Sequence, residues 1–315
     1  MSKQIAIIGE CMIEFSVTGK TCQTGFGGDT LNTAIYLARL SGSQTQIHYV
    51  TALGIDPFSQ QMLTSWQQEQ IDTDLVQQLT DKMPGLYTIV TDGQGERAFY
   101  YWRSNSAAKF WLQTPDTPAI CQHIAETDYV YLSGISLAIL DPSSLAALMA
   151  LLAEVKRRGG QLIFDNNYRP ALWADKPSAK QAYAQILALT DIAFLTLDDE
   201  MALWDDLSYE SALERTQHFG VPEIVIKRGA DCCLIQSGDD FFAVPALRVP
   251  AERIIDTTAA GDSFSAGYLA ARLAGQTPVK AAELGHLLAS TVIQFRGAII
   301  PLHNMPIIEY QLDEC

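Results

Sequence analysis

The stretch 254–268 reads Ile254-Ile255-Asp256-Thr257-Thr258-Ala259-Ala260-Gly261-Asp262-Ser263-Phe264-Ser265-Ala266-Gly267-Tyr268. Two β-branched residues lead into a run of small residues. The segment that follows has the apolar spacing of one helix face, from Phe264 to Leu273. A turn of small residues before a helix lets another molecule approach the backbone. The unpaired N–H groups of the first helical turn and the helix dipole then favour an anion at this position.

Asp262 is the residue of this turn that needs an explanation. A carboxylate beside an anion site is electrostatically unfavourable, unless it serves as the general base for a hydroxyl group next to a phosphate. The alternative is that Asp262 only caps the helix and that Gly261 is an ordinary turn residue. The local pattern leaves both interpretations open, so the choice depends on the rest of the chain.

Composition limits the class of protein. With 315 residues, 48% of them hydrophobic and 18% charged, the chain can bury a large core and is predicted to be a soluble globular protein. Its net charge of −15 argues against nucleic acid or an anionic membrane as a partner. We expect neither a membrane span nor a signal peptide, because the chain has no long apolar run and its start lacks a cleavage pattern.

The cysteine and histidine residues indicate no metal centre. The six cysteines include no CxxC pair, and the five histidines include no HExxH pair. We therefore expect reduced thiols, no metal site built from protein ligands, and a cytoplasmic location.

Alternation of strand-like and helix-like segments predicts an α/β fold. Short apolar runs, typical of buried parallel strands, are separated by segments with helical periodicity, which predicts a mostly parallel central sheet with helices on both faces. The expected strands are 4–9, 48–54, 128–134, 161–165, 192–195, 223–229 and 233–235. The expected helices are 57–69, 143–158, 178–189, a short acidic helix near 198, and 209–219. Ligands of such sheets bind beyond the carboxyl ends of the strands.

A different pattern interrupts this alternation. Residues 10–17 resemble an exposed strand, and residues 86–91 and 98–103 flank Asp92-Gly93-Gln94-Gly95, which has the composition of a hairpin turn. We expect these segments, from about 10–25 and 85–110, to form a small β-sheet lid inserted in a single domain that spans 1–315. The aromatic face of the lid could cover a site, form a dimer contact, or do both.

The segment 25–32 reads Gly25-Phe26-Gly27-Gly28-Asp29-Thr30-Leu31-Asn32 and precedes a helical stripe. Asp29 or Thr30 is the expected helix cap. Paired glycines permit close approach to the backbone, and Asp29 and Asn32 would present polar groups to a ligand there. A turn and cap without a ligand explains the same pattern.

Taken together, the segments 25–32 and 256–264 resemble the two signatures of the ribokinase-like (PfkB) carbohydrate kinases, and the resemblance covers essentially the whole chain. It implies a ribokinase-like three-layer domain with a β-sheet lid. Two further motifs are similar to those of family members that phosphorylate a keto-deoxy sugar acid. They are Tyr100-Tyr101-Trp102-Arg103 and Asp165-Asn166-Asn167-Tyr168-Arg169-Pro170.

The resemblance implies a catalytic centre at the first stretch. Asp262 would be the general base, and the backbone of Ala259, Ala260 and Gly261 would form the anion hole for the transferred phosphoryl group. Relatives often carry glycine at position 259, and we expect the methyl group of Ala259 to make no difference. The implied cofactors are ATP and Mg²⁺. Phosphate oxygens and water would hold the ion, with Asn166 and Glu200 as outer-shell partners.

The same resemblance implies two sets of binding residues. The residues expected to contact the sugar are Gly28, Asp29, Asn32, Tyr87, Tyr101, Arg103, Arg169 and Asp262. The residues expected to contact the nucleotide are Asn167, Arg169, Lys227, Gly229, Ala259, Gly261 and His286.

Two arginines make the case for an acidic substrate. The carboxylate of a sugar acid is costly to bury unless it is paired, and the arginine fork matches it in bidentate fashion. Alternatively, Arg103 caps the hairpin and Arg169 contacts only ATP. The competing functions are a kinase for a neutral ketose such as fructose and a sensor of the same fold without turnover. We expect a sugar acid and ATP as partners, and a homodimer formed through the lid.

Overall fold

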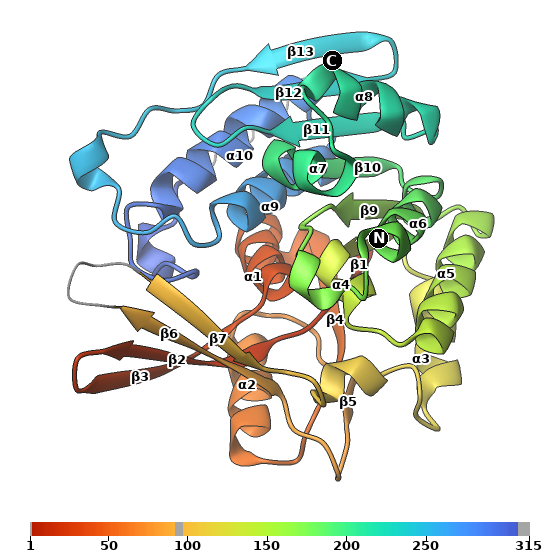
Figure 1. The fold of residues 1–315 in the computed structure, drawn as a ribbon, viewed down its shortest axis with the longest axis vertical. Helices are drawn as coiled ribbons and strands as arrows, with labels where there is room; N and C mark the ends of the chain where they lie inside the picture. Colours follow the sequence, from red (N-terminus) through yellow and green to blue (C-terminus); the bar gives the residue numbers. More distant parts are fainter. Residues whose placement is uncertain (1, 92–96, 308–315) are drawn as a thin grey trace.

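The computed structural model describes residues 2–91 and 97–307 and contains two sheets (Figure 1). The larger sheet has nine strands in the order β13-β12-β11-β10-β9-β8-β1-β4-β5. Its strands are β1 (Lys3–Ile8), β4 (Thr45–Leu53), β5 (Val76–Gln78), β8 (Tyr129–Ser133), β9 (Gln161–Asp165), β10 (Ile192–Thr196), β11 (Glu223–Lys227), β12 (Cys233–Ser237) and β13 (Asp240–Val244).

The sheet is parallel from β5 to β11, and β12 and β13 are antiparallel at one edge. The strands expected from buried apolar runs are all present. The sequence predicted Cys233 to Ile235 as the end of the sheet, and this was wrong because β13 follows β12. Most residues of β13 are exposed, so it lacks the continuous apolar run that identified the other strands.

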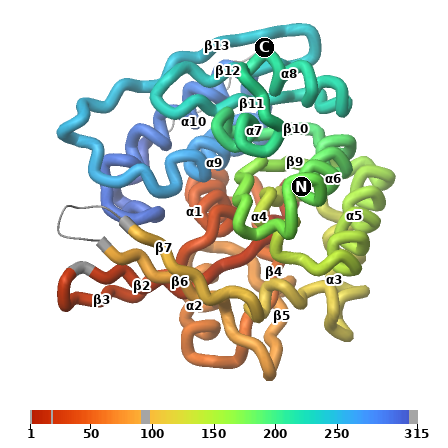
Figure 2. The backbone as a smooth tube through the Cα atoms, in the orientation of Figure 1, coloured from red at the N-terminus to blue at the C-terminus, as the bar shows by residue number. Residues whose placement is uncertain are grey.

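Helices cover both faces of this sheet. They are α1 (Asp29–Ser41), α2 (Pro57–Gln68), α3 (Thr117–Ala125), α4 (Gly134–Ala138), α5 (Pro142–Arg157), α6 (Lys176–Leu187), α7 (Leu197–Trp204), α8 (Tyr209–His218), α9 (Ala260–Leu273) and α10 (Pro278–Val292). One core joins α1, α2, α9 and α10, and the other joins α3, α5, α6 and α7. Figure 2 shows segments from the two ends of the chain side by side, because α1 packs against α9. This packing brings the two signature segments together.

The lid is the four-stranded sheet β3-β2-β6-β7. Its strands are β2 (Met12–Thr18), β3 (Thr21–Gly27), β6 (Gly85–Thr91) and β7 (Arg97–Trp102), and they project at the lower left in Figure 1. The hairpin turn expected at 92–95 lies outside the described residues. The 3₁₀ helix Ala107–Phe110 begins with buried alanines that belong to the main body, so the lid ends near Trp102 rather than near residue 110.

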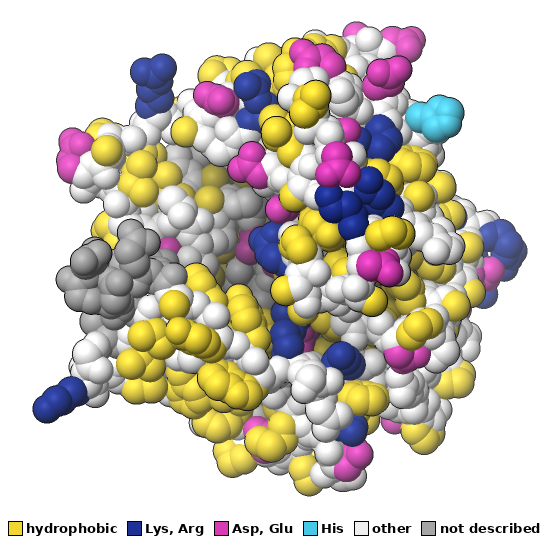
Figure 3. Space-filling view, viewed as in Figure 1, with side chains coloured by type: hydrophobic (Ala, Val, Ile, Leu, Met, Phe, Trp, Pro, Cys, Tyr) yellow, Lys and Arg dark blue, Asp and Glu magenta, His cyan; other side chains and the backbone are white. Residues whose placement is uncertain are grey.

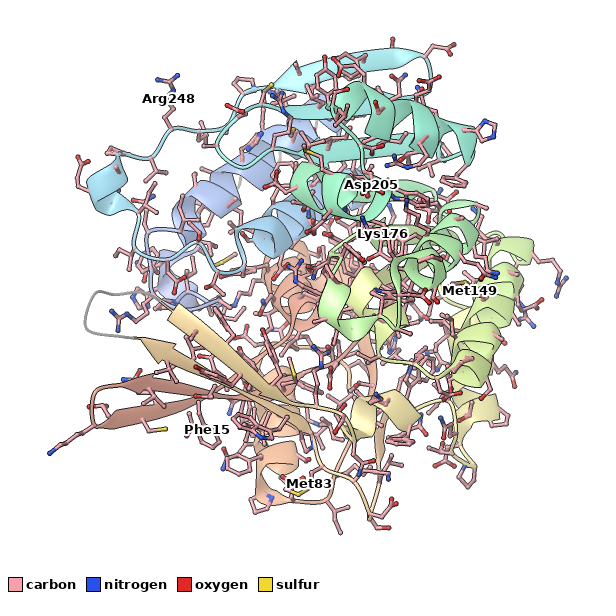
Figure 4. All side chains as sticks on the ribbon, viewed as in Figure 1. Phe15, Met83, Met149, Lys176, Asp205 and Arg248 are labelled. Atoms are coloured by element: carbon pink, nitrogen blue, oxygen red, sulfur yellow. The ribbon has the colours of Figure 1, made fainter. Side chains whose placement is uncertain are left out.

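One face of the lid packs onto the body. The ring of Phe15, labelled in Figure 4, meets the ring of Phe58 on α2 edge to face, with centroids 6.4 Å apart. Residues on the other face of β2, such as Glu14, are therefore free to face the carboxyl ends of the main strands. Strand alternation thus gives the lid one packed face and one open face.

The start of α1 differs from the prediction. The N-cap is Gly28 rather than Asp29 or Thr30, and no side chain caps the helix. The Asp29 carboxylate instead accepts a hydrogen bond from Asn167. Glycine is required at position 28, because a Cβ atom there would lie 2.2 Å from the carbonyl oxygen of Glu10.

Among the described residues, no helix has the length and apolar composition needed to cross a membrane. The five described cysteines, Cys11, Cys22, Cys121, Cys232 and Cys233, are free thiols. Cys315 lies outside the described residues.

Candidate active site

The predicted site residues gather at the carboxyl ends of the parallel strands, opposite the open face of the lid. Figure 3 shows a hollow between the lid and the upper part of the molecule, bordered by basic and acidic side chains. Five elements contribute to this region: the start of α9, the start of α1, the loop after β9, the end of β11 and the lid.

The start of α9 has the geometry of an anion site. The Ala260 N–H donates to the carbonyl oxygen of Thr257 at 3.2 Å, and the Ser263 N–H donates to that of Ala259 at 2.9 Å. Within the described residues, the N–H groups of Ala259, Gly261 and Asp262 donate to no acceptor. Two of the three predicted anion-hole donors, those of Ala259 and Gly261, are therefore available for a ligand, and the Ala260 donor is engaged in the turn.

Asp256 holds the shape of this turn. Its Oδ1 accepts the backbone N–H of Thr258 at 3.0 Å and the Thr258 hydroxyl at 2.7 Å. Its Oδ2 accepts the N–H of Gly297, beyond the end of α10, at 2.9 Å. The buried Asp256 carboxylate thus connects the turn before α9, which we call the anion turn, to the segment that follows α10.

Asp262 lies in the first turn of α9, and the pKa of its carboxyl group is raised. Its Oδ2 accepts a hydrogen bond of 2.8 Å from the amide of Asn32 on α1. Burial raises the pKa of Asp262 to about 7, and the nearby carboxylate of Asp29 adds to this shift. A general base works best when its pKa lies near the operating pH.

A buried cation lies beneath the turn. The Nζ of Lys227, at the end of β11, donates to Asp165 Oδ2 at 2.7 Å and to the Ser265 hydroxyl at 3.2 Å. The Ser265 hydroxyl donates to the same Asp165 oxygen at 2.9 Å. A Cβ atom at Gly261 would lie 3.6 Å from Nζ, so the amino group is directly behind the anion turn. Its positive charge therefore adds to the field of the helix terminus.

The loop after β9 joins the start of α1. Asn167, which has a φ of 24°, donates its amide to the Asp29 carboxylate. Asn166 lies behind it, fully buried, and donates to Glu200 Oε1 at 2.9 Å. Glu200 also accepts from Arg215, and burial raises the pKa of Glu200 to about 7. The buried Glu200 carboxylate therefore stabilises the loop after β9 through Asn166, and it does not line the hollow beneath the lid.

The carboxylate side chains near the site can be compared with the ligands that Mg²⁺ requires. In the described residues, no group of three or more His, Cys, Asp or Glu side chains converges to hold a metal ion. Glu200 is already bonded to Asn166 and Arg215, and Asp165 to Lys227. These residues fit an ion whose ligands come mainly from nucleotide phosphates and water, with protein groups in an outer shell.

The open face of the lid presents aromatic and acidic groups. Glu14, Tyr87 and Tyr101 occupy matched positions on three neighbouring strands, so their side chains share one face. The Tyr87 hydroxyl donates to Glu14, and its ring stacks on Tyr101 with centroids 5.8 Å apart. A Cβ atom at Gly27 would lie 2.1 Å from the Tyr87 oxygen, which explains glycine at that position.

Both predicted carboxylate-binding arginines are paired with carboxylates of the protein. Arg103 lies just after β7 and donates to the buried Glu10. Arg169 contacts Asp199 at 3.3 Å and the Tyr168 carbonyl oxygen at 2.8 Å, and its side chain is 52% exposed. Arg103 is therefore mostly buried with its carboxylate partner, whereas the side chain of Arg169 is half exposed.

The remaining predicted nucleotide contacts lie on the other side of the turn. Gly229 follows β11 with a φ of 61°, a conformation that favours glycine. The ring of His286 on α10 is buried, meets Phe264 edge to face at 5.0 Å, and has Nε2 3.2 Å from the carbonyl oxygen of Val244. Burial lowers the pKa of His286.

Sequence reasoning missed four residues of the site: Glu10, Glu14, Asp165 as the partner of Lys227, and Ser265. Glu14 had a detectable signal, because alternation along residues 12–17 places it on the face opposite Phe15. Glu10 follows a buried apolar strand directly, at the edge of the sheet where ligands bind. The sequence offered no sign of the Lys227–Asp165 pair, since the two residues lie 62 positions apart.

Ala259 corrects one expectation. The methyl group was expected to make no difference, yet Ala259 has a φ of 59°, a left-handed conformation that strains residues with a Cβ atom. We predict that Ala259→Gly raises the free energy of unfolding by about 0.5–1 kcal/mol, because the strain relieved exceeds the entropy gained by the unfolded chain. Urea unfolding measures the change. Ala274→Gly, at a residue with φ −79°, is the control and should destabilise the protein.

Comparison with known proteins identifies the family of the chain. The model of the pfkB family carbohydrate kinases matches residues 2–305. The chain is 58% identical to the 2-dehydro-3-deoxygluconokinase of Escherichia coli over 308 residues, which cover 97% of this chain and 100% of that protein. It is 57% identical to the protein of the same name from Dickeya dadantii over 307 residues, covering 97% of this chain and 99% of the relative.

A solved structure of a putative ribokinase II from E. coli, in complex with ATP and Mg²⁺, has the same fold. It superposes with a TM-score of 0.81 at 21% identity and covers 97% of this chain and 96% of its own. Since the family model and the relatives extend over nearly the whole sequence, this chain belongs to the pfkB family of carbohydrate kinases.

Proposed function

We propose that this protein transfers the γ-phosphoryl group of Mg·ATP to the terminal hydroxyl of 2-keto-3-deoxygluconate. The proposal rests mainly on the partly buried Asp262, which lies next to the unpaired N–H groups at the start of α9. Arg103, at the junction of the lid and the body, adds a cation beside this region. The names of the relatives at 58% and 57% identity support the choice of substrate. A cytoplasmic location is part of the proposal, because ATP is available there as the phosphoryl donor.

In the proposed mechanism, Asp262 accepts the proton of the sugar hydroxyl as that oxygen attacks the γ-phosphorus atom. The bond from this phosphorus to the β–γ bridging oxygen breaks, and ADP leaves. Asn32, bonded to Oδ2 of Asp262, orients the carboxylate. The free N–H groups of Ala259 and Gly261 and the charge of Lys227 stabilise the negative charge on the transferred group. Mg²⁺, when bound with the nucleotide, neutralises the charge that is shared by the phosphates.

The sugar acid would lie between the lid and the start of α1. Arg103 and Arg169 would pair with its carboxylate, and Glu14, Tyr87 and Asp29 would bond its hydroxyl groups. The Nε of Arg103 supports this assignment, because it is buried and has no acceptor among the described residues. A buried donor of this kind is costly unless a ligand completes it.

The nucleotide would lie on the other side of the anion turn. Asn167, Lys227 and Gly229 are proposed to lie near its phosphates and ribose, and His286 near the adenine. Lys227 has the best support, since its amino group is directly behind Gly261.

A coupled assay of ADP release tests the function. Mg·ATP is supplied with 2-keto-3-deoxygluconate, fructose, ribose or gluconate at equal concentration. We expect strong turnover with the keto-deoxy acid alone. Preference for fructose or ribose would overturn the acid-sugar assignment, and no turnover with any of them would overturn the proposed reaction.

Arg103→Ala tests the carboxylate contact. We predict that it raises KM for the keto-deoxy acid by about tenfold or more, because a charge-assisted hydrogen bond contributes about 1.5–3 kcal/mol. The KM for ATP should stay within about twofold. Arg157→Ala, which removes an arginine that is 70% exposed and pairs with Glu154, is the control and should leave both values unchanged. Equal increases for the two substrates would contradict a specific carboxylate contact.

We also propose a homodimer that forms through the lid. Phe99, Tyr100, Tyr101 and Trp102 on β7 are each about half exposed, an unusual concentration of aromatic surface. Light scattering after size exclusion measures the mass of the wild type and of Trp102→Glu. We expect a dimer that dissociates in the variant, and a monomeric wild type would refute the proposal.

A further inference from the structure

The polypeptide passes between the main body and the lid at four places, near residues 10, 28, 85 and 103. Glu10 contacts the other three crossings. Its carbonyl oxygen would lie 2.2 Å from a Cβ atom of Gly28, and its Oε1 would lie 2.9 Å from a Cβ atom of Gly85. Its other carboxylate oxygen, Oε2, accepts from Arg103. Glu10 thus contacts all three of the other chain segments that connect the lid to the body.

The Glu10–Arg103 pair is buried and incompletely satisfied. The Glu10 side chain is 0% exposed and that of Arg103 is 12% exposed. Among the described residues, Arg103 Nε has no acceptor and Glu10 Oε1 has no donor. One nitrogen of the guanidinium group is therefore fixed by Glu10, and another is left for a second acceptor.

We infer that Glu10 is a positioning residue, which holds Arg103 at the lid junction so that its free nitrogen atoms meet the carboxylate of a sugar acid. The inference rests on the proposed function, because Arg103 must contact that carboxylate. Nothing in the family comparison or the motifs assigned a role to Glu10.

The physical reason is the flexibility of arginine. Ordering its long side chain costs rotamer entropy, and an ion pair that exists before the ligand arrives removes this cost from binding. Because Glu10 is enclosed by the junction, it cannot turn away into solvent when the ligand enters. The guanidinium group has enough donors to serve Glu10 and a second carboxylate at once.

The experiment compares Glu10→Ala, Glu10→Gln, Arg103→Ala and the double variant Glu10→Ala/Arg103→Ala. We expect Glu10→Ala to raise KM for 2-keto-3-deoxygluconate by about tenfold or more, with kcat and the KM for ATP changed by less than about twofold. Glu10→Gln keeps an acceptor oxygen at the same place and should restore most of the affinity. The double variant should match Arg103→Ala, because Glu10 acts only through that arginine.

Glu69→Ala is the matched control. Glu69 forms two hydrogen bonds with Arg39, whose side chain is 7% exposed, and this pair joins α1 to the end of α2. Removing it also leaves a buried arginine without its carboxylate. We expect a lower melting temperature and an unchanged KM for both substrates, which separates loss of stability from loss of positioning.

Glu10→Asp covers the case in which Glu10→Ala does not fold. It keeps the charge but withdraws the carboxylate by one methylene group, so the positioning role predicts a raised KM for the acid with that for ATP unchanged. A lower KM in Glu10→Ala or Glu10→Asp would refute the inference, since it would mean that Glu10 competes with the substrate. Additive effects of Glu10→Ala and Arg103→Ala would also refute it.

Different results would refute the proposed function and the role of Glu10. A wild-type enzyme that does not turn over the keto-deoxy acid refutes the proposed function, and the role of Glu10 with it. An active wild type, together with Glu10→Ala that behaves like Glu69→Ala, refutes only the role of Glu10.

Discussion

Asp262→Asn is expected to lower kcat at least about 100-fold while the KM for ATP changes little. A positioned general base contributes about 10²–10⁴-fold to a rate, and an amide cannot accept the proton of the sugar hydroxyl. The substitution keeps the shape of the side chain and a partner for Asn32, so the turn should stay intact. Single-turnover kinetics with Mg·ATP measure the change. Turnover near the wild-type level would end the assignment of Asp262 as the base.

The pH dependence provides an independent check. The active form of Asp262 is the carboxylate, so kcat/KM of the wild type should rise through the pKa of about 7 and then level off. Because the folded pKa of about 7 lies above the ordinary aspartate value of about 3.9, the folded state binds more protons than the unfolded state between those two values. The contribution of Asp262 to stability therefore falls as pH rises from about 4 to 7.

Asp262→Asn should abolish this contribution. At pH 8 the variant should melt at the same temperature as the wild type or higher, because it no longer buries a charge. At pH 5, where the wild-type group is largely protonated, the difference should shrink. Differential scanning calorimetry at the two pH values measures it. A variant that is less stable than the wild type at pH 8 would show that Asp262 is a structural residue instead.

Lys227→Met is expected to destabilise the protein by about 3–5 kcal/mol, because it leaves Asp165 as a buried charge without its partner. Lys227 and Asp165 are 9% and 4% exposed, so water cannot replace the lost ion pair. Methionine keeps most of the volume, which restricts the effect to the charge. Urea unfolding monitored by circular dichroism measures the loss.

Two further variants separate charge from packing. Lys227→Met/Asp165→Asn should recover part of the lost stability, since no unpaired charge remains, but not the activity, since the cation behind Gly261 is gone. Lys156→Met removes a lysine that is 32% exposed and pairs with Asp191, and it should cost only about 1 kcal/mol or less. A loss of similar size for Lys156→Met and Lys227→Met would contradict the importance of burial.

Much of the fold could be predicted because its signals are local. Buried strands such as β1 and β9 are short apolar runs, and α9 follows a turn of small residues with an apolar stripe behind it. The exposed edge strand β13 and the strand β3 of the lid lack these patterns. Their pairing depends on neighbouring strands, so each was missed as a separate strand.

The sequence indicated which residues the candidate site contains, but it did not indicate which residues contact one another. Asp262, Asn32, Lys227 and Arg103 stand in motifs that resemble those of the family. Their partners lie far away in the sequence, as Glu10 does from Arg103, and depend on how the lid joins the body. The strain at Ala259 was also missed, because small residues near a turn are compatible with several backbone conformations.

The sequence alone was sufficient for the α/β alternation and the two signature segments, because each is encoded within a few neighbouring positions. The same holds for the residue types of the proposed phosphoryl-transfer site. The packing of α1 against α9 was needed to bring Asn32 to Asp262. It also took the folded chain to show that Lys227 and Arg103 each form an ion pair with a carboxylate. The physical reason is that ion pairing and burial depend on distance in space, which a chain acquires only when its separate elements pack.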